Sequence, residues 1–167
     1  MKKVFSTFLV ALICSGCAGY KLGSVKPAYL RGIQSIAVPT FTNRTLTPRI
    51  EALVAGTVVK QFQQDGTYRI TTEEQADGIL QGEIISVSRS PARSVRGNVL
   101  STTEFMLTVR ASYTLVDKAG KTLGAGQAGG GTSFFVSSDV STDERQALPL
   151  AAEELARQLV SQLSEGW

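Results

Sequence analysis

The residues with the most evident chemistry are four arginines in the middle of the chain. Arg89, Arg93 and Arg96 lie within residues 88–98, a segment without any acidic residue, and Arg110 lies on the polar face of the strand expected next. Guanidinium groups make bidentate contacts with phosphate and carboxylate groups. We therefore interpret residues 88–98 as a polar loop that contacts an anionic headgroup or an acidic partner surface, with a solvated loop tip as the alternative.

The inventory of reactive side chains argues against catalysis. The chain has no histidine and only two cysteines, Cys14 and Cys17. Zinc sites, Ser-His-Asp triads and Cys-His pairs all need residue types that the folded part lacks. The carboxylates Glu73 and Glu74 are adjacent in sequence, so they point apart and cannot flank one reacting bond. We predict no catalytic residue, no metal site and no enzymatic activity.

A run of three glycines at residues 129–131 could suggest a phosphate-binding loop. The run lacks the lysine and hydroxyl ending of such loops and does not lead directly into a helix. We predict instead a strand that is bent or bulged there, or that another backbone approaches closely.

The N-terminus has the pattern of a lipoprotein leader. Two lysines precede residues 4–14, an uncharged and mostly apolar run that is too short to span a bilayer. Small residues then lead into Cys17, as at a site where the leader is cut and the cysteine is acylated, although Cys14 stands where leucine is usual. We predict a signal peptide over residues 1–16 and N-acyl and S-diacylglycerol lipid on Cys17, with no other cofactor.

This lipid would hold the protein at a membrane surface, because each buried methylene group adds about 0.8 kcal/mol of binding free energy. A free thiol at Cys17, or a disulfide between Cys14 and Cys17, is the alternative. Ala18 stands where an aspartate would favour retention in the inner membrane. The sequence therefore predicts the periplasmic side of the outer membrane.

Charge and length set the broad class of the protein. The chain has 17 basic and 14 acidic residues, and loss of Lys2 and Lys3 with the leader leaves 15 basic residues. This balance argues against a nucleic-acid partner, which needs a concentrated basic face. A chain of 167 residues, of which 43% are apolar, is sufficient for one buried core. We predict a lipidated tether over residues 17–32 and a single domain over residues 33–167.

Hydrophobic periodicity predicts the elements of this domain. The predicted strands cover residues 33–41, 68–72, 78–88, 105–115 and 121–136, with a hairpin turn over residues 117–120. One helix runs from an N-cap at Thr47 to Gly66. A second covers residues 143–163 and becomes regular only near Leu148, because Pro149 interrupts its first turn.

The order of these elements predicts the fold class. Apolar residues alternate with polar ones along residues 105–115, which indicates a sheet with one buried face. The fold predicted is α+β, a two-layer sandwich in which two helices pack on one face of a mostly antiparallel sheet of four to five strands.

Several segments together resemble the LptE family of lipopolysaccharide-assembly lipoproteins. They are GYKLG at residues 19–23, IAVPTFTNRT at residues 36–45, ADGILQGEI at residues 76–84 and LTVRASYTLVDKAGKTL at residues 107–123. Ala18 and Gly124 depart from the usual pattern. The resemblance implies a non-catalytic outer-membrane lipoprotein that plugs the LptD β-barrel, helps it assemble and contacts lipopolysaccharide.

A second interpretation stays open on the same residues. The segment IAVPTFTN also resembles the opening strand of penicillin-binding-protein activators and curli-secretion lipoproteins, which would imply a regulator or a secretion component. The early GYKLG and the 151 residues from Cys17 to Trp167 favour the LptE family. The partner distinguishes the two interpretations, since the alternative predicts a peptidoglycan synthase or a homo-oligomeric ring.

Overall fold

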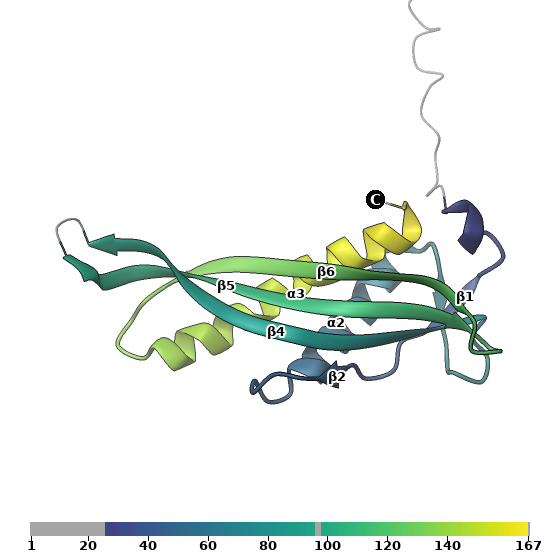
Figure 1. Ribbon diagram of the computed structural model, residues 1–167, viewed down its shortest axis with the longest axis horizontal. Helices are drawn as coiled ribbons and strands as arrows, with labels where there is room; N and C mark the ends of the chain where they lie inside the picture. Colours follow the sequence, from purple (N-terminus) through teal and green to yellow (C-terminus); the bar gives the residue numbers. More distant parts are fainter. Residues whose placement is uncertain (1–25, 96–97, 167) are drawn as a thin grey trace, which may run out of the picture.

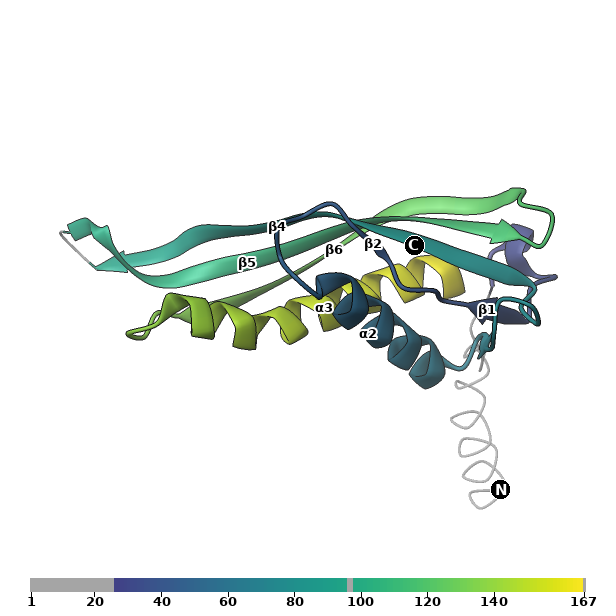
Figure 2. The same cartoon turned by 90° about the horizontal axis from the view of Figure 1, so that it is seen from below.

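A twisted sheet that carries helices on one face forms the domain (Figures 1 and 2). The computed structural model describes residues 26–95 and 98–166. Its elements are η2 (Ala28–Leu30), β1 (Ser35–Ala37), β2 (Thr42–Asn43), α2 (Ile50–Asp65), β3 (Arg69–Ile70), β4 (Gly78–Val95), β5 (Asn98–Asp117), β6 (Thr122–Phe135) and α3 (Val140–Ser164). The α+β class predicted from the sequence is confirmed.

The sheet is mostly antiparallel, as predicted, but it is mixed rather than purely antiparallel. In the described part of the chain it has six strands in the order β3-β1-β4-β5-β6, with β2 beside β4. The long strands β4, β5 and β6 form an antiparallel meander, whereas β1 and β2 pair in parallel with β4, and β1 also pairs in parallel with β3. The parallel pairs arise because α2 crosses over between β1 and β3, so that both strands run in the same direction.

Strand β5 confirms the predicted alternation. Its inward side chains are buried or half-buried against the helices: Phe105, Leu107, Val109, Ala111, Tyr113 and Leu115. The core also contains the buried faces of the two helices, with Val54, Val58 and Phe62 from α2 and Leu155, Leu159 and Leu163 from α3. Figure 2 shows both helices on the same side of the sheet, and no other described element covers the opposite face, which we call the open face.

The start of helix α2 differs from the prediction, because the helix begins at Ile50 and not after an N-cap at Thr47. The Asn43 side chain organises the preceding loop: its amide donates to the Thr47 carbonyl oxygen at 2.9 Å and to the Glu51 carboxylate at 2.9 Å. Arg49 then takes a left-handed conformation with φ of 63° directly before the helix. The helix ends at Gly66 as expected, with φ of 75°.

Helix α3 begins earlier than predicted. The Asp139 carboxylate caps it by accepting from the backbone N–H groups of Ser141 and Thr142. Hydrogen bonds from the Thr142 and Ser141 hydroxyl groups, together with these backbone contacts, lower the pKa of Asp139 to about 2. Pro149 lies inside the regular helix, where its side chain is exposed, so the prediction that regular structure starts near Leu148 was wrong.

The molecule is elongated, and its two ends differ. Figure 1 shows the first described residues and the C-terminal end of α3 together at one end of the sheet. At the other end the β4–β5 hairpin extends beyond both helices. We call the end with the first described residues proximal and the end with the β4–β5 hairpin distal. Most of the core lies beneath the proximal half of the sheet, and the distal hairpin has little helix to pack against.

Candidate functional site

The arginine segment lies on strand rather than in a loop. Strand β4 continues to Val95, so Arg89 and Arg93 are strand residues. Arg96 lies outside the described residues. The predicted end of the strand at Ser88 was wrong because the residues of β4 beyond Arg89 extend past the helices, where no core imposes apolar residues on them.

Arg89 is fixed on the helix side of the sheet. It pairs in register with Leu107, whose side chain is buried in the core. Its guanidinium group donates to the Glu144 carboxylate on α3 at 2.7 Å and lies 4.8 Å from the centre of the Phe105 ring. The contact joins strand β4 to the first turns of α3, and Arg89 already has an acidic partner.

Arg93 and Arg110 lie on the open face, far from each other. Arg93 pairs in register with Glu104, and their charged groups are 3.7 Å apart. Arg110 lies six residues further along β5, which corresponds to about 20 Å. Arg110 is exposed and has no ion-pair partner among the described residues. The structure therefore does not bring Arg89, Arg93 and Arg110 together into one cluster.

The open face around Arg110 is polar. Arg110 pairs in register with Ser86 on β4 and with Gly129 on β6. Most of its neighbours on the same face have short side chains or none, namely Ser88, Thr108, Ser112 and Gly131, and the longer Glu83 and Gln127 lie opposite Ser112. Short hydroxyl groups and bare backbone offer hydrogen bonds to a flat partner without filling space, and Arg110 adds one positive charge at the centre.

Two glutamines of α3 cover part of the edge of β6. The Gly129 N–H group donates to Gln158 Oε1 at 2.6 Å, and Gln162 Nε2 donates to the Gln127 carbonyl oxygen at 3.2 Å. Tyr113 donates its hydroxyl hydrogen to Gln162 Oε1 at 2.7 Å, and burial raises the pKa of this tyrosine to about 12, so it remains a donor near neutral pH. The sequence analysis missed both glutamines, although their spacing of four residues beside a buried stripe was a usable signal.

Gly130 explains part of the glycine run. A Cβ atom at this position would lie 2.0 Å from the Ala151 carbonyl oxygen and 2.3 Å from the Leu155 nitrogen, both backbone atoms of α3. The prediction of close approach by another backbone is thus confirmed at Gly130. At Gly129 and Gly131 a Cβ atom would meet its nearest neighbours only at 3.7 Å and 3.4 Å.

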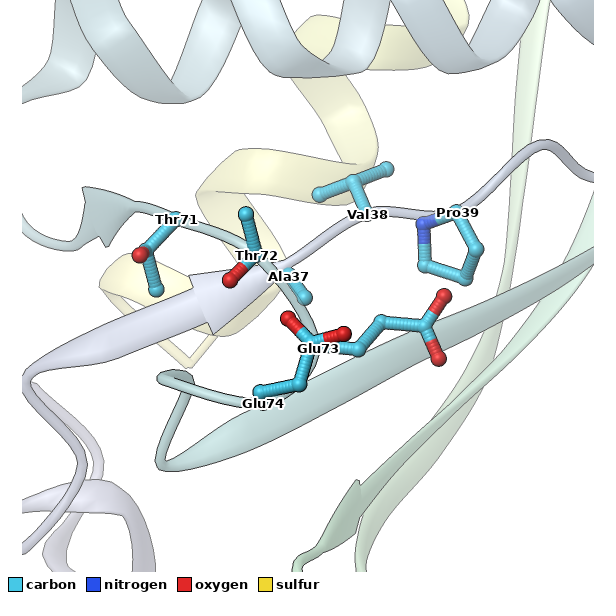
Figure 3. A pocket seen from close by; sticks show the side chains of 7 residues that line it. All are labelled: Ala37, Val38, Pro39, Thr71, Thr72, Glu73 and Glu74. Carbon is cyan, nitrogen blue, oxygen red and sulfur yellow. The ribbon is translucent and has the colours of Figure 1, made fainter.

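A hollow of about 480 Å³ lies between the ends of β1 and β3 (Figure 3). Figure 3 shows the carboxylates of Glu73 and Glu74 directed to different sides, as the sequence predicts for adjacent residues. Both side chains are exposed, and a hydrogen bond with Thr72 lowers the pKa of Glu74. No cluster of three acidic, histidine or cysteine residues that could hold a metal occurs in the part of the chain that the structure describes. The hollow thus offers solvated charges and no acid-base pair.

The predicted lipidation site, Cys17, lies outside the described residues. Within the residues that are described, no helix is both long enough and apolar enough to cross a membrane. The fold and the open face together define a two-layer α+β domain whose distinctive feature is a surface rather than an enclosed cavity.

Comparison with known protein families assigns this chain to one of them. The model of the LptE family, described as lipopolysaccharide-assembly, matches residues 33–163. The chain therefore belongs to the LptE family. A search of curated proteins gives no match.

Solved structures share the fold at low identity. Protein XCC0632 from Xanthomonas campestris has 12% identity and a TM-score of 0.57, over 77% of this chain and 82% of that one. A PelC dodecamer from Paraburkholderia phytofirmans has 18% identity and a TM-score of 0.55, over 88% and 99%. Protein CT253 from Chlamydia trachomatis has 10% identity and a TM-score of 0.53, over 77% and 94%. Likenesses at these identities show the fold alone.

Proposed function

We propose that this protein is a non-catalytic outer-membrane lipoprotein that plugs an LptD-type β-barrel, helps the barrel assemble and assists lipopolysaccharide on its way to the outer leaflet. The match to the LptE family over residues 33–163 carries the proposal. The structure is consistent with it in one specific respect: no described element covers the open face of the sheet, so this face is free to contact the wall of a barrel lumen.

The anchor of this protein is proposed to be lipid on Cys17. Its mature chain would then sit on the periplasmic side of the outer membrane, with the tether leading to the first described residues, at the end of the sheet opposite the β4–β5 hairpin (Figure 1). Replacement of Cys17 by serine should abolish both metabolic lipid labelling and membrane retention. Unchanged membrane association of Cys17→Ser would contradict the anchor.

The arginines are proposed to contact the anionic groups of lipopolysaccharide or an acidic surface of the barrel. The structure makes Arg110 and Arg93 the best candidates on the open face, because Arg110 has no ion-pair partner among the described residues and the Arg93 side chain is 71% exposed. Arg89 already binds Glu144, so Arg89→Gln serves as a matched control that removes the same charge.

Binding to lipopolysaccharide and recovery of the barrel should both be measured for these variants. Arg93→Gln with Arg110→Gln should weaken at least one of the two by about tenfold, since charge-assisted contacts contribute about 1.5–3 kcal/mol each. Arg89→Gln should have a smaller effect. If the double variant, Arg89→Gln and Arg96→Gln all leave both measurements unchanged, the role of the arginines is excluded.

The central experiment is purification of the lipidated protein from its native outer membrane in mild detergent, followed by identification of the proteins that accompany it. A large β-barrel in one-to-one amount is the expected result. A peptidoglycan synthase would instead support the regulator interpretation. A self-assembled ring would support a secretion component, an outcome worth testing because PelC, which shares the fold, forms a dodecamer.

A further inference from the structure

The distal half of strand β6 presents a bare edge of the sheet. Strand β6 pairs with β5 along one side only. The Val136 N–H group donates to the Thr103 carbonyl oxygen on the β5 side, whereas the Gly129 N–H group points away from β5 to Gln158. Backbone groups alternate in direction along a strand. The N–H and C=O groups of Gly131, Ser133 and Phe135 therefore also point away from β5.

These three residues lie beyond the glutamines that cover the rest of the edge. Helix α3 passes directly beneath β6 at Gly130, and its side chains reach the edge only on the proximal side, at Gln127 and Gly129. Gly131, Ser133 and Phe135 are exposed, and none of their edge-facing groups has a hydrogen-bond partner among the described residues. The edge of β6 over residues 131–135 is therefore available for pairing with another strand.

The chemistry of this edge does not discourage pairing. Exposed edges in natural sheets usually carry lysine, proline or an inward charge, because unpaired backbone groups recruit other strands. The segment Thr122–Phe135 contains no charged residue and no proline. Phe135 is 69% exposed, which is a large exposed fraction for a phenylalanine.

A groove lies beside the open edge on the helix side. It has a volume of about 320 Å³, and its lining is mixed. Phe134, Phe135, Ala147 and Leu150 are apolar, and Ser133, Asp143 and Gln146 are polar or charged. The Leu150 side chain is 55% exposed. A strand added to the edge would direct every second side chain into this groove.

We propose that an extended, uncharged segment of the barrel adds to the edge of β6 at residues 131–135 as a further strand, with an apolar side chain in the groove beside Leu150. This inference rests on the proposed function, which supplies the barrel.

The size of the paired segment indicates what kind of partner can occupy the edge. Five residues of pairing span about 17 Å. A second copy held by this pairing alone would bury far less than the roughly 1,600 Å² of a stable interface. The occupant therefore belongs to a partner that already holds the domain elsewhere, so that its local concentration is high.

Amide hydrogen exchange tests the added strand directly. The full-length lipidated protein is measured alone and in its purified complex with the barrel, at single-residue resolution. Exchange at Gly131, Ser133 and Phe135 should slow by about tenfold or more in the complex, as expected for new backbone hydrogen bonds. Exchange at Thr132 and Phe134, which face β5, should change little. Equal exchange rates in the two samples at residues 131, 133 and 135 would overturn the proposal.

A proline variant tests the same edge independently. Ser133→Pro removes an edge-facing N–H group without removing a bond to β5, a position where strands tolerate proline. Ala125→Pro is the matched control, because Ala125 is an exposed residue of the same edge outside the proposed site. Ser133→Pro should speed dissociation from the barrel about tenfold, and Ala125→Pro should not. Equal dissociation of wild type and both variants would overturn the proposal.

Two further outcomes separate this inference from the proposed function. If the wild-type protein brings down no barrel, the proposed function fails, and the added strand loses its partner. If the barrel is present but the free protein is a dimer that Ser133→Pro makes monomeric, the edge binds a second copy and the barrel is excluded as its occupant. Light scattering of the free protein measures this.

Discussion

The two edges of the distal sheet both lack a further described strand, but they differ in regularity and in chemistry: β4 has register shifts there and β6 has none. Beyond Ile84, strand β4 has no described strand on its outer side, and this edge carries Arg89, Pro91 and Arg93. Strand β6 forms the other edge with a glycine, a serine and a phenylalanine at residues 131, 133 and 135. Charge and proline discourage strand addition at the first edge, whereas the second edge permits it. The sheet is therefore directional, with one side closed to further strands and the other open.

This difference indicates a second role for the arginines, the prevention of unwanted strand pairing. An arginine-rich segment can be read as a binding site for anions, but at a sheet edge the same charges also prevent unwanted pairing. Arg89 illustrates the second role, since it is held by Glu144 and lies against Phe105. Arg110, in the middle of the sheet and without an ion-pair partner in the described part of the chain, has no edge to protect. Among the three described arginines of the candidate site, it is therefore the one whose charge neither an acidic neighbour nor an edge position accounts for.

The largest effect is expected at the glycine that α3 crosses. Gly130→Ala should destabilise the protein by about 3 kcal/mol, because its Cβ atom would overlap backbone atoms of α3 and push the helix away from β6. Gly131→Ala, one residue further on, is the control and should cost less than about 1 kcal/mol. Chemical unfolding of the two variants gives both values, and similar losses would show that the backbone contact at Gly130 is not decisive.

An intermediate effect is expected where the edge of β6 is covered. Gln158→Leu should lower stability by about 1 kcal/mol, because the Gly129 N–H group loses its partner and exchanges with water. The variant would also extend the open edge toward the proximal end. Exchange at Gly129 should speed up in Gln158→Leu and remain unchanged in Gln63→Leu, an exposed position of α2. An unaltered rate at Gly129 would mean that the glutamine does not protect the edge.

The smallest effect on stability is expected at the charged edge of β4. Arg89→Thr with Arg93→Thr should change the free energy of unfolding by less than about 1 kcal/mol, since both ion pairs are partly solvated. Weak self-association at high concentration should nevertheless increase, because two charges that discourage strand addition are removed from an edge in which only Pro91 remains to oppose it. Sedimentation at rising concentration measures this against Lys60→Thr with Arg145→Thr, which removes two charges from helices. Equal self-association of the two double variants would remove the contrast between the edges.

The parts of the fold that bury apolar surface could be predicted from the sequence. The alternation along β5, the helical stripe of α3 and the end of α2 at Gly66 all follow from local patterns that a core imposes. The end of β4 beyond Arg89 could not be predicted in this way, because no described helix covers it and polar residues suit it as well as apolar ones. Long-range contacts were also out of reach: Arg89 and Glu144 are 55 residues apart, and only the path of α3 brings them together.

The parallel strands show a different limit. Two residues, Thr42 and Asn43, form β2, and they read as a polar loop because strands of this length carry no periodicity. The neighbours of β1 depend on the crossover through α2, which is a property of topology and not of any local pattern. Such errors changed the number and direction of the strands but left the layers of the sandwich as predicted.

The length of the sheet sets how far the protein can reach from a membrane. Strand β4 has 18 residues, which correspond to about 60 Å, or about twice the thickness of a bilayer's hydrocarbon core. The chain enters the sheet at the end opposite the hairpin (Figure 1), and residues 17–26 can add at most about 30 Å. With the proposed lipid on Cys17, one leaflet would hold the proximal end while the hairpin worked some tens of ångströms away. Anchoring and contact with a partner would then occur at separate places on one rigid body.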